Sequence, residues 1–293
     1  MTTIATHDGK FHADDVFAVS ALLLTVGDDA EVIRTRDSGK LKNADYVVDV
    51  GGISDSDKGR FDHHQAGGAG ARGNNIPYAA FGLVWKKFGD KLSSGDVSVA
   101  KRVDEVLVAP IDANDNGINL AVPNMSRIFP YDISDAIRAF IPTWLEDDIH
   151  LDERFKETMF FAKRIIELEI KRAEAVVAGE MKVKELYQNT VDKRLIALPG
   201  DYSWKDTLAQ FKEPLFVVHP QDGTWRLYCV RDNSHIFKSR KDLPEHWAGL
   251  RDAELANITG VPDATFCHRN RFMAVASSRE GVLALAKLAL LNS

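Results

Sequence analysis

Short apolar runs alternate with helical patterns over the first 125 residues, and this alternation restricts the fold more than any other feature. Parallel strands need crossover connections, which are usually helices, so the pattern predicts a parallel sheet with helices packed on it. The fold class that we expect is therefore α/β. The expected strands are Thr3–Thr6, Glu31–Thr35 and Tyr46–Val50, and the expected helices are Asp15–Thr25, Pro77–Phe88 and Val97–Val108.

A long amphipathic helix is expected from Leu151 to about Gln188, because apolar residues recur there every three or four positions. Gly179 is the point at which this helix would break. The expected division is a catalytic parallel-sheet domain over residues 1–150, a connecting helical segment over 151–190, and a smaller α/β domain over 191–293.

The smaller domain carries local turn and helix signals. Residues 215–230 are two β-rich runs around Asp222-Gly223, which is typical of a β-hairpin. Residues 264–290 predict two strands followed by a helix, with Ser277 and Glu280 as its capping box.

Composition excludes several classes of protein. No run approaches 18 apolar residues, so we expect no membrane span, and the first residues lack the basic and apolar regions of a secretion signal. We expect a cytoplasmic protein whose two cysteines, Cys229 and Cys267, are reduced and structural. The formal net charge of -6 argues against a bulk electrostatic footprint for nucleic acid, although local basic patches remain possible.

Histidine and aspartate gather at four places near the expected strand or helix ends. These are His7, His12, Asp14 and Asp15 in "THDGKFHADD", Asp49 in "YVVDVGG", Asp62, His63 and His64 in "FDHHQ", and Asp112 and Asp115 in "PIDANDNG". Each cluster has a plain alternative as a helix cap, a polar turn or a backbone hydrogen bond. Ligands of open α/β sheets bind at the carboxyl ends of strands, so four such clusters together favour a site.

The ligand types indicate which metal the site would hold. A set of histidines and aspartates without cysteine suits Mn²⁺, or Mg²⁺ with more water, better than structural zinc. With this many carboxylates, two metal ions per chain are expected, about 3.5–4 Å apart and bridged by one aspartate and a water.

The four clusters, in this order, resemble the DHH phosphoesterase superfamily, which is named for the triplet found here at 62–64. More closely, the chain resembles the MYG1 family in "THDGKFHADDVFA", "VIRTRD", "VVDVGG", "DHHQ", "IDANDNGI", "FKSRKDLPEHWAGLRDAEL" and "TFCHRN" with "SREGVLALA". Proteins of this family are described as metal-dependent hydrolases, and 3'-5' exoribonuclease activity is assigned to eukaryotic members. The resemblance implies a DHH-type N-terminal domain with a two-metal site and a C-terminal domain that closes over substrate.

The resemblance also implies roles for single residues. Asp49 matches the bridging aspartate, and His64 would face the phosphate; the match does not decide between Asp112 and Asp115. The implied metal ligands are His7, His12, Asp14, Asp49, Asp62, His63, Asp112 and Asp115, and the implied catalytic residues are His64 and Asp15.

The C-terminal motif departs from the family pattern after His268, where the family has a glycine-rich turn and this chain reads "RNRFMAVA". Ala274-Val275 lacks the backbone freedom of glycine. We therefore expect Arg269, Arg271 and Arg279 to bind phosphate through their side chains, together with His268. Ordinary solvated surface is the plain alternative for these arginines.

The function expected from these observations is a metal-dependent phosphodiesterase, most closely a 3'-5' exoribonuclease-like hydrolase. Its substrate would be RNA, a short oligonucleotide or a small phosphoester, and a homodimer is possible. One alternative is a phosphatase or pyrophosphatase for a small phosphorylated metabolite, which the acidic net charge mildly favours. The other is a non-catalytic, metal-stabilised regulator.

Overall fold

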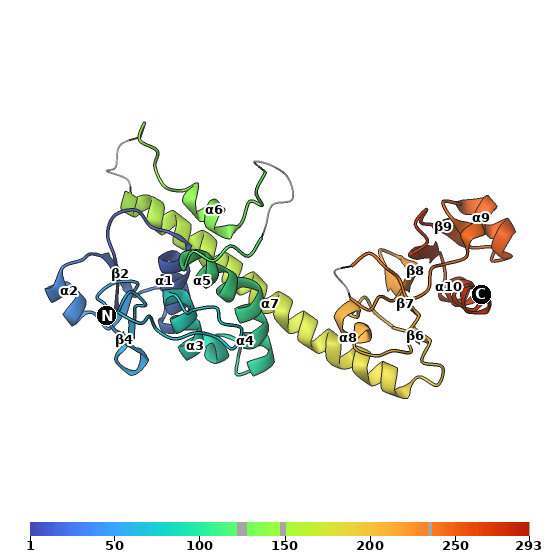
Figure 1. Ribbon diagram of the computed structural model, residues 1–293, viewed down its shortest axis with the longest axis horizontal. Helices are drawn as coiled ribbons and strands as arrows, with labels where there is room; N and C mark the ends of the chain where they lie inside the picture. The colour runs from blue at the N-terminus through green and yellow to red at the C-terminus, as the bar shows by residue number, and fades with distance from the viewer. Residues whose placement is uncertain (122–127, 147–150, 234–235, 293) are drawn as a thin grey trace. The chain divides into compact units, whose positions relative to one another are not determined.

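The computed structural model describes residues 1–121, 128–146, 151–233 and 236–292. It contains two compact units, Met1–Glu174 and Ala175–Ser293, and each has its own five-stranded mixed sheet (Figure 1). The unit boundary falls inside the long helix α7 (Leu151–Asn189). The expected break at Gly179 is wrong. A side chain there would lie 3.2 Å from the backbone nitrogen of Ser203, so glycine allows the chain to pass close to an unbroken helix.

The first sheet has the strand order β2-β1-β3-β5-β4. Its strands are β1 (Thr3–Thr6), β2 (Glu31–Arg34), β3 (Tyr46–Val48), β4 (Ser54–Asp55) and β5 (Arg60–Phe61). Strand β1 is parallel to β2 and β3, and β3 is parallel to β5, whereas β4 is antiparallel at the edge. The α/β class and the three expected strands are confirmed. Strands β4 and β5 have two residues each, too few to show a period in sequence.

Helix α1 (Ala13–Val26) is buried around its whole circumference from Ala13 to Leu22, which explains why its sequence from Val16 to Leu24 is apolar except for Ser20. It packs against β1 and α3 (Ala80–Leu92). The start predicted for the latter helix is wrong. Pro77 lies before it and is bridged to Ala71. The other helices are α2 (Ser38–Asn43), α4 (Val97–Val103), a π-helical turn (Asp104–Val108), α5 (Ala109–Asp115) and α6 (Ile133–Arg138).

The second sheet has the order β6-β7-β8-β10-β9. Its strands are β6 (Leu195–Ala197), β7 (Phe216–Gln221), β8 (Thr224–Cys229), β9 (Ala264–Cys267) and β10 (Met273–Ala276), and only the β6–β7 pair is parallel among these described strands. The predicted hairpin is confirmed. Asp222 and Gly223 both have positive φ, as a tight turn between twisted strands requires.

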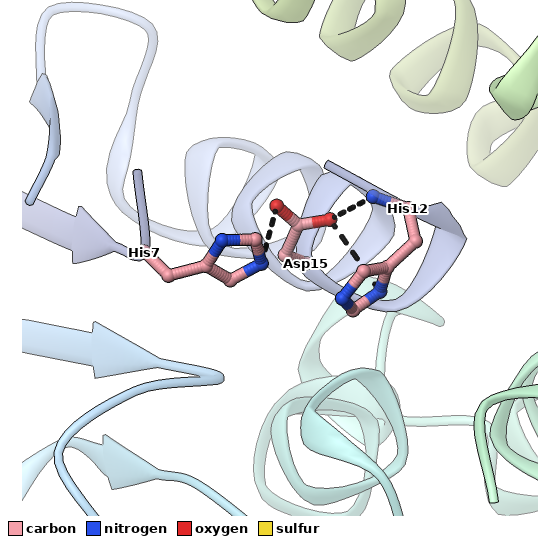
Figure 2. A group of neighbouring side chains, drawn as sticks. All are labelled: His7, His12 and Asp15. Atoms are coloured by element: carbon pink, nitrogen blue, oxygen red, sulfur yellow. Dashed lines mark hydrogen bonds and ion pairs between the residues drawn. The ribbon is translucent and has the colours of Figure 1, made fainter. Parts of the chain in front are cut away.

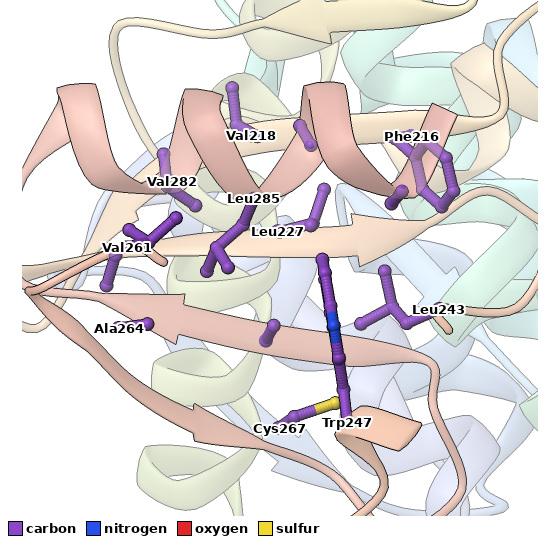
Figure 3. Close-up of a cluster of buried hydrophobic side chains, with 14 of the residues drawn as sticks. Phe216, Val218, Leu227, Leu243, Trp247, Val261, Ala264, Cys267, Val282 and Leu285 are labelled. Carbon is purple, nitrogen blue, oxygen red and sulfur yellow. The ribbon is translucent and has the colours of Figure 1, made fainter. Parts of the chain in front are cut away.

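Both faces of this sheet are covered. Phe216, Val218 and Leu227 pack beneath α10 (Arg279–Leu291) together with Trp247 (Figure 3). Val217 points the other way, toward residues of α7 and toward Trp204 beside α8 (Lys205–Ala209). Alternate residues of one strand thus serve two cores.

Two further sequence predictions are decided in this unit. The cap of α10 is Ser278, whose Oγ accepts a hydrogen bond from the Gly281 nitrogen at 3.0 Å, so the prediction of Ser277 is wrong by one residue. Cys229 and Cys267 are buried free thiols, and burial raises their pKa values to about 12 and about 11. Within the described parts of the chain, no helix has both the length and the apolar character needed to cross a bilayer.

Candidate metal centre

The predicted His and Asp residues of the N-terminal unit lie at one edge of the first sheet. Three parallel strands end directly before them: β1 before His7, β3 before Asp49, and β5 before the triplet 62–64. Because parallel strands end at the same edge, residues distant in sequence meet there. The first turn of α1 adds Asp14 and Asp15, and the last residue of α5 adds Asp115.

Asp49 lies at the centre of this group. Its Oδ2 is 3.4 Å from Nε2 of both His7 and His12, and its Oδ1 is 3.2 Å from His63 Nε2 and 3.5 Å from His64 Nδ1. Each carboxylate oxygen therefore faces a different pair of histidines. The backbone of Asp49 is left-handed (φ 57°), a conformation that aspartate and asparagine tolerate better than most residues.

Asp15 joins His7 and His12 (Figure 2). Its Oδ1 accepts a hydrogen bond from the His12 backbone nitrogen at 2.8 Å, which closes the capping box of α1, and its Oδ2 is 3.2 Å from His7 Nε2. His7 Nδ1 lies 2.9 Å from the Asp8 carbonyl and donates to it, so the neutral ring would present an Nε2 lone pair to carboxylate oxygens. Such an arrangement needs a proton or a cation between the atoms.

Asp49, His63 and His64 form a second group that could hold a metal ion, and Asp14, His63 and Asp115 form a third. His63 Nε2 lies 3.1 Å from Asp115 Oδ2 and 4.0 Å from Asp14 Oδ2. The two Asp14 oxygens also accept hydrogen bonds from the backbone nitrogens of Ala80 and Phe81, at the N-terminus of α3. The partial positive charge of that helix end stabilises a carboxylate there.

Burial and crowding shift the pKa values of the carboxyl groups. Burial raises the pKa of Asp14 well above its ordinary value, and the nearby charge of Asp49 raises it further. Burial also raises the pKa of Asp15 to about 6, although His12 and His7 act to lower it.

The imidazoles respond to the same negative charge. Burial by itself would lower the pKa of His63, but the negative charges of the Asp115 and Asp49 carboxylates, 3.1 and 3.2 Å from its Nε2, outweigh burial and raise the pKa to about 10. The pKa of His7 is also raised, since Asp49 and Asp15 outweigh its burial. The cluster therefore attracts positive charge strongly, whether protons or metal ions.

Several buried polar atoms of this cluster have no hydrogen-bond partner among the residues that the structure describes. They are His7 Nε2, Asp15 Oδ2, both Asp49 carboxylate oxygens and His63 Nε2. Buried polar atoms without partners are costly, and native proteins pair nearly all of them. Divalent cations would satisfy all five atoms, and the His/Asp donor set suits such ions, so these residues fit a metal site.

Among the residues that the structure describes, three groups could hold a metal ion, and Asp62 and Asp112 lie outside them. Asp62 Oδ1 is 2.7 Å from His64 Nδ1, and its Oδ2 accepts a hydrogen bond from the Gly52 nitrogen. Asp112 Oδ2 accepts a hydrogen bond from Arg72 Nη1 at 2.7 Å. Of the two aspartates that the sequence left open, Asp115 is the one placed beside the histidines.

Sequence reasoning missed three cations near these groups. Arg72 lies in the glycine-rich stretch after the triplet, and it ties that stretch to Asp104 and Asp112. Lys10 and Arg36 line a pocket of about 440 Å³ together with His7, His12, Asp49, Val50, Gly51, Gly52, Asp62 and His64. Their positions, in the turn after β1 and soon after β2, were the available signal.

The predicted substrate-binding residues of the second unit do not form one cluster. His268, Arg269 and Arg271 lie in the turn between β9 and β10, whereas Arg279 begins α10 beyond the other end of β10. Arg271 Nη2 is 3.5 Å from Asp242, and the Arg279 guanidinium lies 5.9 Å from the centre of the Trp225 ring. Their role in substrate binding stays a prediction.

Residues 3–290 match a family model named MYG1_exonuc, which is described as "Uncharacterised protein family (UPF0160)". The chain belongs to the MYG1 family. It is 32% identical to the MYG1 exonuclease of Homo sapiens, over 98% of this chain and 85% of that protein. It is also 32% identical to a MYG1 protein of Saccharomyces cerevisiae, over 98% of this chain and 95% of that protein. A MYG1 protein of Caenorhabditis elegans is 31% identical, over 98% of this chain and 94% of that protein.

Proposed function

We propose that this MYG1-family chain is a metal-dependent phosphodiesterase, a DHH-type 3'-5' exonuclease that acts on RNA. The observation that carries the proposal is the set of buried polar atoms around Asp49 that have no hydrogen-bond partner among the described residues. In addition, each carboxylate oxygen of Asp49 faces a different pair of histidines. The names of relatives, such as the human MYG1 exonuclease, support the choice of a nuclease.

Two ions would share the site. We assign His7, His12 and Asp15 to one ion and His63, Asp14 and Asp115 to the other, with Asp49 between them. Asp15 thereby becomes a ligand in the proposal, where the sequence suggested a catalytic group. Bound Mn²⁺ or Mg²⁺ would lower the pKa of a water and offset the charge that develops on a phosphate.

The remaining residues of the site would position the substrate. Asp62 fixes the ring of His64, which is exposed and lines the same pocket as Lys10 and Arg36. An imidazole and two cations at this place favour a phosphate group in the pocket. Asp112 would act indirectly. Its carboxylate accepts hydrogen bonds from Arg72 and from the Gly82 nitrogen, and these bonds fix the position of α5, the helix that carries Asp115.

The test is the digestion of 5'-labelled single-stranded RNA and DNA of ten nucleotides with Mn²⁺. A 3'-5' exonuclease gives a ladder of shortening labelled strands, whereas the opposite polarity releases a labelled mononucleotide at once. Pyrophosphate and p-nitrophenyl phosphate are measured beside them. Faster turnover of these small substrates than of RNA and DNA would indicate a phosphatase or pyrophosphatase in place of a nuclease. Bound metal without turnover of any substrate would indicate a non-catalytic regulator.

A further inference from the structure

A second pocket, of about 320 Å³, lies in the C-terminal unit, and sequence analysis assigned it no role. It is lined by Trp204, Lys205, Tyr228, Cys229, Arg231, Phe237 and Phe272. Four of these seven residues are aromatic and two are cationic. None of them belongs to the metal groups or to the predicted phosphate-binding arginines.

The fold holds three of the four aromatic rings of this pocket in place, those of Trp204, Tyr228 and Phe272. Tyr228 in β8 stacks on His219 with ring centres 5.4 Å apart and lies 5.8 Å from Trp204, which precedes α8. Phe272 immediately precedes β10, and its carbonyl accepts a hydrogen bond from the Cys229 nitrogen at 2.9 Å. Rings fixed in this way lose little conformational entropy when a flat ligand stacks on them.

The two cations lie against these rings. The Arg231 guanidinium is 4.3 Å from the centre of the Phe237 ring and 5.8 Å from that of Phe272, and Lys205 Nζ is 6.0 Å from Trp204. Among the residues that the structure describes, no carboxylate lies within ion-pair distance of either cation. Their charge is therefore available to an anion.

Aromatic faces beside unpaired cations suit a ligand that joins a flat ring to an anion. Proteins bind single-stranded nucleic acid in this way, by stacking bases on aromatic rings while lysine and arginine neutralise phosphates. The volume of about 320 Å³ is at the small end for ligand pockets, which suits one nucleotide better than a longer segment.

We propose that this pocket binds one nucleotide, with its base stacked on the aromatic residues and its phosphate paired with Arg231 and Lys205. The inference deepens the proposed function by naming a second contact for nucleic acid, and it rests on that function for its biological purpose. The nucleotide could belong to an oligonucleotide or be free, and the experiment separates these two sources.

The test measures binding without hydrolysis. A fluorescein-labelled five-nucleotide single-stranded RNA is titrated with the full-length protein in EDTA, and unlabelled AMP is used as a competitor. The pocket variants are Arg231→Gln and Phe237→Ala; the Phe237 side chain is exposed, so its removal spares the core. The matched controls are Arg251→Gln, whose guanidinium lies 4.8 Å from the Phe266 ring, and Phe160→Ala, another exposed phenylalanine, on α7.

The expected result for Phe237→Ala is a Kd raised about fivefold to 150-fold, the range for loss of one base–aromatic stack. Arg231→Gln should also raise the Kd, because it removes a cation that would pair with the phosphate, and both controls should leave the Kd unchanged. Competition by AMP would identify a free nucleotide as a sufficient ligand, and its failure would identify a nucleotide within a strand; both support the pocket. Equal affinity in all five proteins, or no binding in EDTA, would overturn it. Absence of turnover with Mn²⁺ would overturn the proposed function and leave this binding result standing.

Discussion

Replacing Asp49 with asparagine tests the metal assignment most directly. Asparagine keeps the shape of the side chain and tolerates the left-handed backbone at this position, so the change removes mainly one negative charge. Because the two oxygens of Asp49 face separate histidine pairs, this single substitution should weaken the binding of both metal ions. Asp15→Asn should weaken the binding of one ion, since Asp15 belongs to only one of the described metal groups.

The expected magnitude follows from ligand linkage. At a Mn²⁺ concentration 100 times the Kd, one bound ion adds about 2.7 kcal/mol to the free energy of unfolding, so two ions add about 5.4 kcal/mol. For a unit of the size of residues 1–174, each kcal/mol raises Tm by about 2–4 °C, so the wild type should gain about 11–22 °C. Asp15→Asn should retain about half of this gain and Asp49→Asn almost none.

The assay combines metal analysis with thermal unfolding in EDTA and in Mn²⁺. Asp222→Asn is the matched control, because Asp222 is also left-handed and lies in an exposed turn of the other unit. It should bind metal as the wild type does. The reasoning is refuted if Asp49→Asn retains two ions, or if it and Asp15→Asn lose metal to the same extent.

Three further outcomes are expected. His63→Ala should lower Mn²⁺ content, whereas His64→Ala should keep the metal and lower turnover, and equal metal loss in both variants would contradict this division. Arg72→Met should lower the free energy of unfolding in urea by about 3–5 kcal/mol, because it leaves Asp112 buried without its cation. The double variant Arg72→Met with Asp112→Asn should recover most of the lost free energy of unfolding. An Arg72→Met protein whose free energy of unfolding lies within about 1 kcal/mol of the wild type would refute the role of the ion pair. Burial lowers the pKa of His219 in the folded protein, so on acidification this side chain binds a proton in the unfolded chain before it does so in the folded one. The free energy of unfolding should therefore fall as the pH drops below about 6.5, the ordinary pKa of histidine. His219→Gln should reduce that slope in pH-dependent denaturation, and an unchanged slope would count against the assignment.

Local spacing was enough to identify several elements of both units. The strand Thr3–Thr6, the buried helix after it and the hairpin at Asp222-Gly223 follow from side-chain periodicity and turn chemistry, which act over a few residues. Histidine and aspartate directly after parallel strands were likewise visible, because strand ends meet at one edge wherever the sheet is parallel.

Short elements and exact starts were not predictable from such spacing. Strands β4 and β5 have two residues each and exist through their pairing with each other and with β3. Ser277 and Ser278 are equally good caps by residue type. Asp263 decides between them, since it binds the backbone nitrogens of both serines and leaves the Ser278 hydroxyl to cap the helix.

Which carboxylate of a pair enters a site is decided by long-range contacts. Asp112 and Asp115 are three residues apart on α5, and the sequence treats them alike. Arg72, 40 residues earlier, binds Asp112 and leaves Asp115 beside His63. In the second unit, β10 separates Arg271 from Arg279, and the pairing of β8 with β10 brings Tyr228 and Cys229 beside Phe272. The sequence determined which chemical groups are present and where strands and helices form, because those depend on neighbours in the chain. Only the tertiary structure decided which groups meet, because burial and charge pairing act between residues far apart in sequence.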